Sequence, residues 1–297
     1  MKNKKGTEVI LQELRVYLRA IGYQQNTQRG IALGVKAFLN WMHQKGVEQL
    51  QGVDRALLLA YQEYLETRPN QTRAGGLSSK MIRDYLWTVQ LLFNWQEQQG
   101  KLSYNPMSSY ELPKAVSQKR SILSKQQVQQ LYQACSHVQQ SCVLHLYYGL
   151  GLRRTEGEQL NLQEVDYRAG WVWIKKGKGG RGRKLPLTPQ IQADLKSYIL
   201  EHRPRVNCPA LLLNSQGRRY RGDTALQLVK QLAQQANIQQ KVDLHSLRHS
   251  IATHLLQGGM SLLQVRDYLG HKHLESTQHY LHYDTTRLFT EQIHGSK

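Results

Sequence analysis

Six side chains in the second half of the chain could together carry out phosphodiester chemistry without a metal ion. A Tyr phenol can attack phosphorus, guanidinium groups can hold the non-bridging oxygens as negative charge develops, and Lys and His can move protons. The candidates are Arg153, Lys178, His245, Arg248, His271 and Tyr280. This combination of residue types predicts strand exchange on DNA.

Two of the candidates, His245 and Arg248, are three positions apart, so one helical turn can direct both side chains at one ligand. Such a pair is a weak signal by itself. His245 and His249 also have the spacing of a zinc-binding helix, but a metalloprotease helix has Glu directly after the first His, and Ser246 stands there. We therefore expect no metal ion here.

A second possible zinc site comprises Cys135, His137, Cys142 and His145. These residues are spread along two predicted helices, and Cys142 lies beside Val143 and Leu144 in an apolar run. Free buried cysteine is the better interpretation. The sequence thus predicts neither a metal nor another cofactor.

The Gly-rich run 177–183 (GKGGRGR) resembles a phosphate-binding loop in composition only. It lacks the Walker spacing and precedes a predicted strand, not a helix, which argues against nucleotide binding. Two interpretations stay open at this point. The run is either a solvated basic turn or a basic hairpin that reaches into a DNA groove.

The charge of the chain favours a polyanionic partner. The 297 residues include 40 Lys+Arg and 21 Asp+Glu, which gives a net charge of +19 and a pI of about 9.9. The excess is present both in residues 1–105 and in 106–297, as expected of a protein that grips a duplex from two sides. Three Cys indicate a reducing, cytoplasmic location, and no apolar run predicts a membrane span.

The first hundred residues show helical periodicity four times. The predicted helices start near Ile10, Thr27, Asp54 and Ser78, and the last three of these residues are candidate N-caps. We expect an N-terminal helical domain over 1–105. A linker with Pro106 and Pro113 follows over 106–120, where periodicity is lost.

The remainder, 121–297, is predicted to form a second, mixed α/β domain with a C-terminal tail. It opens with a possible capping box, Ser124 and Gln127. The apolar runs predict strands at 171–174, 184–187 and 211–213, and helices at 189–201, 222–236, 246–257 and 262–269.

Two stretches resemble the conserved boxes of the tyrosine recombinases, the phage integrase family. The first is 148–156 (YGLGLRRTE), and the second combines 244–256 with 269–280. The order Arg, Lys, His-x-x-Arg, His, Tyr is matched over roughly residues 120–285. The resemblance implies a mostly α fold with a small β-sheet, in which a SAM-like core-binding domain precedes a mixed α/β catalytic domain.

The resemblance also implies roles for the candidates. Arg153 and Arg248 would clamp the scissile phosphate, Lys178 would protonate the leaving 5′-oxygen, and His245 would assist proton transfer. His271 would hydrogen-bond a non-bridging oxygen, and Tyr280 would be the nucleophile. These six positions are the catalytic set that the sequence predicts.

Three neighbouring positions are less certain. Glu156 and His249 match family positions that support the site. The first box usually has a small residue after its Arg, whereas Arg154 follows Arg153 here. Arg153 is the better match to the family, and Arg154 remains a competitor.

The activity implied is site-specific recombination of double-stranded DNA through a 3′-phosphotyrosyl intermediate and a Holliday junction. Four protomers would act on two sites, and a second recombinase as partner stays open. A type IB topoisomerase and a non-catalytic DNA-binding protein are the alternatives. The target site, and the choice between chromosome-dimer resolution and movement of a mobile element, cannot be derived from the sequence.

Overall fold

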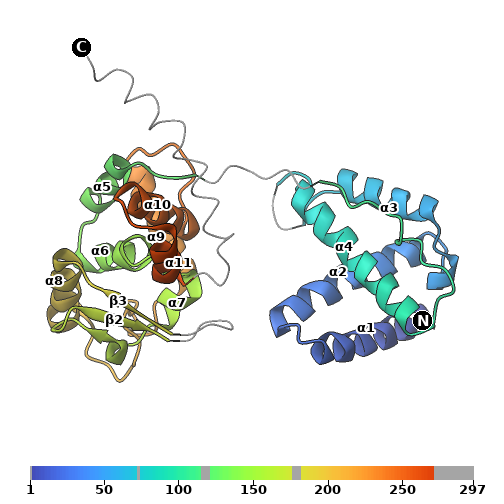
Figure 1. The fold of residues 1–297 in the computed structure, drawn as a ribbon, viewed down its shortest axis with the longest axis horizontal. Coiled ribbons are helices and arrows are strands. Elements are labelled where there is room, and N and C mark those ends of the chain that lie inside the picture. The colour runs from blue at the N-terminus through green and yellow to red at the C-terminus, as the bar shows by residue number, and fades with distance from the viewer. Residues whose placement is uncertain (1, 72–73, 115–120, 176–181, 271–297) are drawn as a thin grey trace, which may run out of the picture. The chain divides into compact units, whose positions relative to one another are not determined.

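The protein is described by a computed structural model that covers residues 2–71, 74–114, 121–175 and 182–270, with side chains from residue 6 onward. The chain divides into two units, Met1–Gln118 and Lys119–Lys297. Each unit has its own hydrophobic core. The architecture is mostly helical with one small sheet, which confirms the predicted fold class (Figure 1).

Four α-helices lie within the described residues of the first unit, as predicted. They are α1 (Lys2–Ala20), α2 (Gln25–Gln44), α3 (Arg55–Thr67) and α4 (Ser79–Gln98), with a short 3-10 turn at Leu50–Gly52. The predicted caps of α3 and α4 are confirmed. The Asp54 side chain accepts from the Leu57 amide and that of Ser78 from the Met81 amide.

The predicted cap at Thr27 is wrong, because α2 already begins at Gln25. The turn after α1 is short. Gly22 adopts a left-handed φ of 83°, and the Tyr23 amide donates back to the Leu18 carbonyl at 2.9 Å. This closure lets the next helix start only three residues later, so Thr27 lies inside its first turn.

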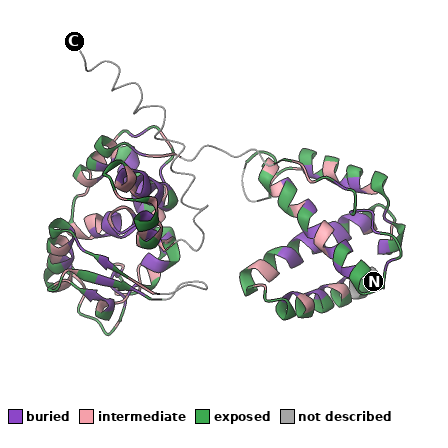
Figure 2. Ribbon diagram, viewed as in Figure 1, coloured by how far each residue is buried: buried purple, intermediate pink, exposed green. Residues whose placement is uncertain are grey.

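The core of the first unit is built around aromatic rings. The Phe38 ring contacts those of Tyr61 and Phe93 edge-on, at centroid distances of 5.0 and 6.1 Å. Met107 and Tyr110 are also buried in this core. Part of the segment 106–120 therefore packs on the first unit, and buried positions follow the inward faces of the helices (Figure 2).

The second unit contains seven α-helices within its described residues. They are α5 (Lys125–Gln133), α6 (Val138–Leu144), α7 (Arg154–Gln159), α8 (Pro189–Ser197), α9 (Gly222–Gln235), α10 (Leu244–Gln257) and α11 (Leu262–Leu269). Three further turns interrupt them: π-turns at His145–Gly149 and Tyr198–His202, and a 3-10 turn at Leu162–Glu164. The predicted Ser124–Gln127 capping box is present at α5.

The sheet is antiparallel in the order β1-β2-β3, with β1 at Val165–Asp166, β2 at Trp171–Ile174 and β3 at Arg183–Pro186. Val172 pairs with Leu185, and both are buried against the helices. Ile174 pairs with Arg183 at the end of the ladder that leads to 176–181. This register directs Arg183 to the same face as Leu185.

The third predicted strand, 211–213, is wrong. Only isolated bridges occur there, between Ala210 and Asn161 and between Leu213 and Arg219. The leucines are buried, but the Leu213 amide donates to the Tyr198 hydroxyl instead of to a strand neighbour. An apolar run predicts burial, and here its backbone pairing is limited to single bridges.

No helix in the described ranges is long and apolar enough to cross a membrane.

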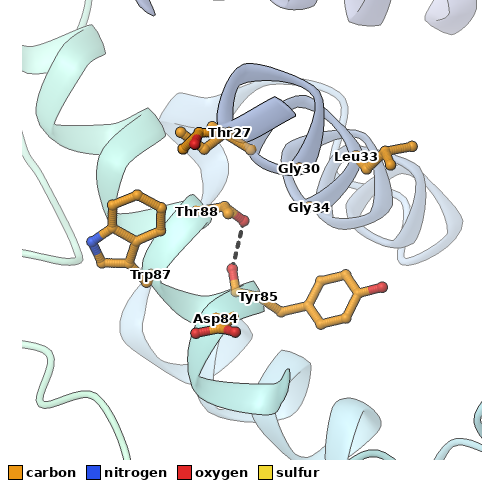
Figure 3. Close-up of a pocket in the computed structure, with 9 residues that line it drawn as sticks. Thr27, Gly30, Leu33, Gly34, Asp84, Tyr85, Trp87 and Thr88 are labelled. Atoms are coloured by element: carbon orange, nitrogen blue, oxygen red, sulfur yellow. Dashed lines mark hydrogen bonds between the residues drawn. The ribbon is translucent and has the colours of Figure 1, made fainter. Parts of the chain in front are cut away.

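A pocket is lined by residues of α2 and α4 on the first unit, among them Gly34 and Thr88 (Figure 3). The Thr88 hydroxyl donates to the Tyr85 carbonyl at 2.7 Å. A Cβ atom at Gly34 would lie 2.4 Å from that hydroxyl oxygen. The two helices can therefore approach this closely only because residue 34 has no side chain.

We predict that Gly34→Ala lowers the free energy of unfolding by about 1–2 kcal/mol through overpacking. Gly30→Ala is the matched control, because it lies one turn earlier on α2 and its Cβ would meet nothing within 4 Å. That control should leave stability unchanged or raise it by up to about 1 kcal/mol. Urea denaturation measures both, and equal effects of the two substitutions would contradict this account.

Candidate active site

The segment before Arg153 is shaped by a change of helical pitch. After α6 the chain continues as the π-turn His145–Gly149, closed by the Leu150 amide donating to the His145 carbonyl at 2.7 Å. Gly151 then adopts a left-handed φ of 57°, and a Cβ there would lie 2.6 Å from Leu269 Cδ2. The chain reverses tightly against α11, and α7 starts with Arg153 at its N-cap.

Arg153 is tied to two segments and remains partly accessible. Its amide and its guanidinium both donate to the Glu156 carboxylate, at 2.9 and 2.7 Å. The second guanidinium nitrogen donates to the Gly270 carbonyl at 2.6 Å. The side chain is 41% exposed, so part of it remains open to solvent.

Arg248 lies on α10 and is only 2% exposed. Its guanidinium donates to the carbonyls of Gly151 and of Leu269, the latter at 2.7 Å. Nη1 also lies 3.9 Å from Glu156 Oε2, an ion-pair distance. The structure thus brings Arg153 and Arg248 together, on consecutive carbonyls at the end of α11 and both within ion-pair distance of Glu156.

Glu156 has a second strong partner, Arg183 of β3, which the sequence reasoning missed. Arg183 donates to both carboxylate oxygens, at 3.1 and 2.9 Å. Burial by itself would raise the pKa of Glu156, but the hydrogen bonds and charge of Arg183, with those of Arg153, hold it at about 2. The available signal was the alternation Arg183-Lys184-Leu185, which directs Arg183 inward beside a core leucine.

His245 of the predicted catalytic set and His249, predicted to support the site, lie on the first two turns of α10. Asp243 caps this helix and accepts from the amides of His245 and Ser246, at 3.0 and 2.8 Å. His245 is exposed, whereas His249 is buried, and their rings meet edge-on at 4.3 Å. His245 therefore lies at the surface, one turn before Arg248, as the helical spacing predicts.

The Arg154 side chain forms its ion pair with α9 and not with Glu156. Its guanidinium pairs with the Asp223 carboxylate on α9 at 2.5 Å. A Cβ at Gly222 would lie 2.6 Å from Arg154 Cγ, so the side chain runs closely along the start of that helix. No ion pair joins Arg154 to Glu156 in the described part of the chain, in contrast to Arg153.

Three members of the predicted catalytic set, Lys178, His271 and Tyr280, lie outside the described residues. The described chain reaches Lys175 and resumes at Gly182 on either side of Lys178. It ends at Gly270, next to His271. The C-terminal tail is likewise outside the described ranges.

The alternative zinc residues have other partners. His145 contacts Asp194 Oδ2 through Nε2 at 2.7 Å and the Tyr132 hydroxyl through Nδ1 at 2.9 Å. Burial lowers the His145 pKa, an effect that Asp194 partly opposes. Cys142 is buried and its thiol pKa is raised by burial. Among the described residues, no group of three or more His, Cys, Asp or Glu side chains could hold a metal ion.

Comparison with known proteins identifies a family. The model of the phage integrase family matches residues 121–287. Tyrosine recombinase XerC 2 of Ralstonia nicotianae is 30% identical over 276 residues, which cover 89% of this chain and 79% of that protein. XerD of Staphylococcus haemolyticus is 28% identical over 95% of this chain and 96% of its own length.

Two solved structures share the fold. XerH recombinase bound to a palindromic difH substrate has a TM-score of 0.73 at 22% identity, over 90% of this chain and 79% of that one. A lambda integrase dimer bound to a COC′ core site has a TM-score of 0.71 at 16% identity, over 92% and 94%.

The pKa of Glu156 predicts a pH-dependent contribution to stability. Because its pKa falls from the usual 4.5 to about 2 on folding, the contribution is present above pH 4.5 and is lost as the pH falls toward 2. Glu156→Gln should thus cost about 3 kcal/mol of unfolding free energy at pH 7, and roughly 2 kcal/mol less at pH 3. Urea denaturation of both proteins from pH 7 to 3 measures the difference in their unfolding free energies. A difference that stays constant over this range would contradict the prediction.

Proposed function

Because this chain belongs to the phage integrase family and is a site-specific tyrosine recombinase, we propose that Tyr280 is the nucleophile of a reaction that Arg153 and Arg248 make possible. The observation that carries the proposal is the pair of guanidiniums held at fixed positions beside Glu156. Such fixed donors stabilise the charge that develops on a phosphate in the transition state.

In the proposed cleavage step, the Tyr280 oxygen forms a bond to phosphorus and the bond from phosphorus to the 5′-oxygen breaks. Lys178 gives a proton to that oxygen, which leaves as a 5′-hydroxyl, and the 3′-phosphate stays on the Tyr. The reverse attack by a 5′-hydroxyl of the other duplex restores the phosphodiester. The covalent ester conserves the bond energy, so the exchange needs neither ATP nor a metal ion.

The remaining roles follow the resemblance and the local geometry. His245, exposed on the first turn of α10, would assist proton transfer at Tyr280. His271, the residue after Gly270, would hydrogen-bond a non-bridging oxygen. Buried His249 contacts the His245 ring and would support its orientation.

The proposed partner is double-stranded DNA carrying specific recombination sites. The net charge of +19 supports phosphate contacts as the main source of affinity. Four protomers would assemble on two paired sites and exchange strands through a Holliday junction, with a second recombinase as a possible member of the assembly. Three free thiols support a cytoplasmic location.

We predict that Tyr280→Phe binds DNA as tightly as the wild type but forms no covalent adduct, because only the phenol oxygen is lost. Tyr283→Phe, three residues away, is the matched control and should retain cleavage. A nicked suicide substrate traps the adduct, which is then counted as an SDS-resistant band. An adduct that persists in Tyr280→Phe would rule out this nucleophile.

A second variant pair separates the two adjacent arginines. Arg153→Ala should slow cleavage by ~100-fold or more, as expected when a transition-state donor is lost. Arg154→Ala removes an ion pair with Asp223 and should change the cleavage rate by less than about threefold. Single-turnover rates at saturating protein measure both, and the reverse order of effects would assign the clamp to Arg154.

A further inference from the structure

Arg183 is a buried cation that none of the proposed catalytic roles uses. It opens β3 and its side chain is 13% exposed. Besides Glu156, it reaches α11, where its Nε donates to the Tyr268 carbonyl at 2.8 Å. A Cβ at Gly270 would lie 2.8 Å from its Nη1, so the end of α11 is closely fitted to this guanidinium.

The hydrogen bonds at Glu156 show how its charge is shared. Oε1 accepts from the guanidiniums of Arg153 and Arg183, at 2.7 and 3.1 Å. Oε2 accepts from the Arg153 amide and from the second nitrogen of Arg183, both at 2.9 Å. Arg183 thus holds the carboxylate with two parallel bonds, whereas the Arg153 guanidinium contributes one.

The balance of charge within this cluster determines how much positive charge is available to bind a phosphate. Three guanidiniums face one carboxylate: the side chains of Arg248 and Arg183 are only 2% and 13% exposed, whereas that of Arg153 is 41% exposed. If Arg183 were neutral, Glu156 would have to be balanced by the two arginines of the proposed clamp. A buried carboxylate next to the scissile phosphate would then compete with it for the same donors.

We propose that Arg183 is a positioning residue that neutralises Glu156, and that Arg153 and Arg248 can therefore direct their charge at the scissile phosphate. Arg183 itself does not touch the DNA strand that reacts. This inference rests on the proposed function, because it assumes that Arg153 and Arg248 form the phosphate clamp. The clamp would thus depend on a third guanidinium, that of Arg183, which is mostly buried.

The test is a double-mutant cycle on Arg183→Gln and Glu156→Gln, with the single-turnover rate of adduct formation on the suicide substrate as readout. Arg183→Gln alone should slow cleavage at least ~tenfold, because Glu156 would then be balanced by Arg153 and Arg248 alone. Adding Glu156→Gln removes the competing charge and should raise the rate at least ~fivefold above that of Arg183→Gln. A residue needed only for folding would give a double variant no faster than the single one, and that result would overturn the proposal.

The cycle remains decisive if Arg183→Gln alone does not fold. In the Glu156→Gln background there is no charge to neutralise, so adding Arg183→Gln should change the rate by less than about threefold. A loss of tenfold or more there would also overturn the proposal. Arg183→Lys keeps the positive charge and should cleave faster than Arg183→Gln.

Arg203→Gln is the matched control, because Arg203 is also partly buried and donates to the carbonyls of Leu211, Cys208 and Ala210, with no bond to Glu156. Glu156→Gln should not restore any rate that Arg203→Gln loses. Failure of the proposed function would give a different result: the wild-type protein itself would form no adduct that depends on Tyr280.

Discussion

One buried negative charge, the Glu156 carboxylate, organises the described part of the catalytic unit. A carboxylate removed from water is costly unless it is paired and hydrogen-bonded, and Glu156 accepts four hydrogen bonds from two arginines. Those arginines come from the start of α7 and the start of β3, and α10 contributes Arg248 at ion-pair distance. Segments about ninety residues apart in sequence are thus held together by one side chain.

The surrounding core gives these polar contacts their fixed geometry. Most of α10 is buried, so Arg248 approaches the site from a helix packed on nearly every side. Its guanidinium donates to backbone carbonyls, which do not move as side chains do. A cation fixed in this way needs little reorganisation when negative charge develops beside it, which is the condition for electrostatic catalysis.

Local features were predictable from the sequence, and features set by distant contacts were not. The caps Asp54, Ser78 and Ser124 depend on residues three positions away, and all three were predicted. The Thr27 cap failed because the closure of the preceding turn decides where α2 starts. The run 211–213 was correctly expected to be apolar, but its amide partner, the Tyr198 hydroxyl, lies fifteen residues away.

The same distinction applies to the site. The order and spacing of its residues indicated the chemistry, and the family match places the chain among enzymes that use it. Arg183 escaped notice because its partners, Glu156 and Tyr268, are 27 and 85 positions away. In a Gly- and Lys-rich run it resembled a surface cation, and the pairing of β2 with β3 is what makes the alternation Arg183-Lys184-Leu185 turn it inward.

The π-turn at His145–Gly149 makes the length of this segment as important as its composition. A π-turn holds one residue more than the α-helical turn it replaces, so losing any one residue here would let the helix return to ordinary pitch. A turn of ordinary pitch that kept all five residues would instead rotate the chain directly after Gly149 by about 100°, the turn that one residue makes in an α-helix. Arg153 and Glu156 both follow the turn, so they would move together relative to Arg248 on α10 and Arg183 on β3. The π-turn thus keeps Arg153 and Glu156 beside those two arginines although the segment carries one residue more than an α-helical turn would hold.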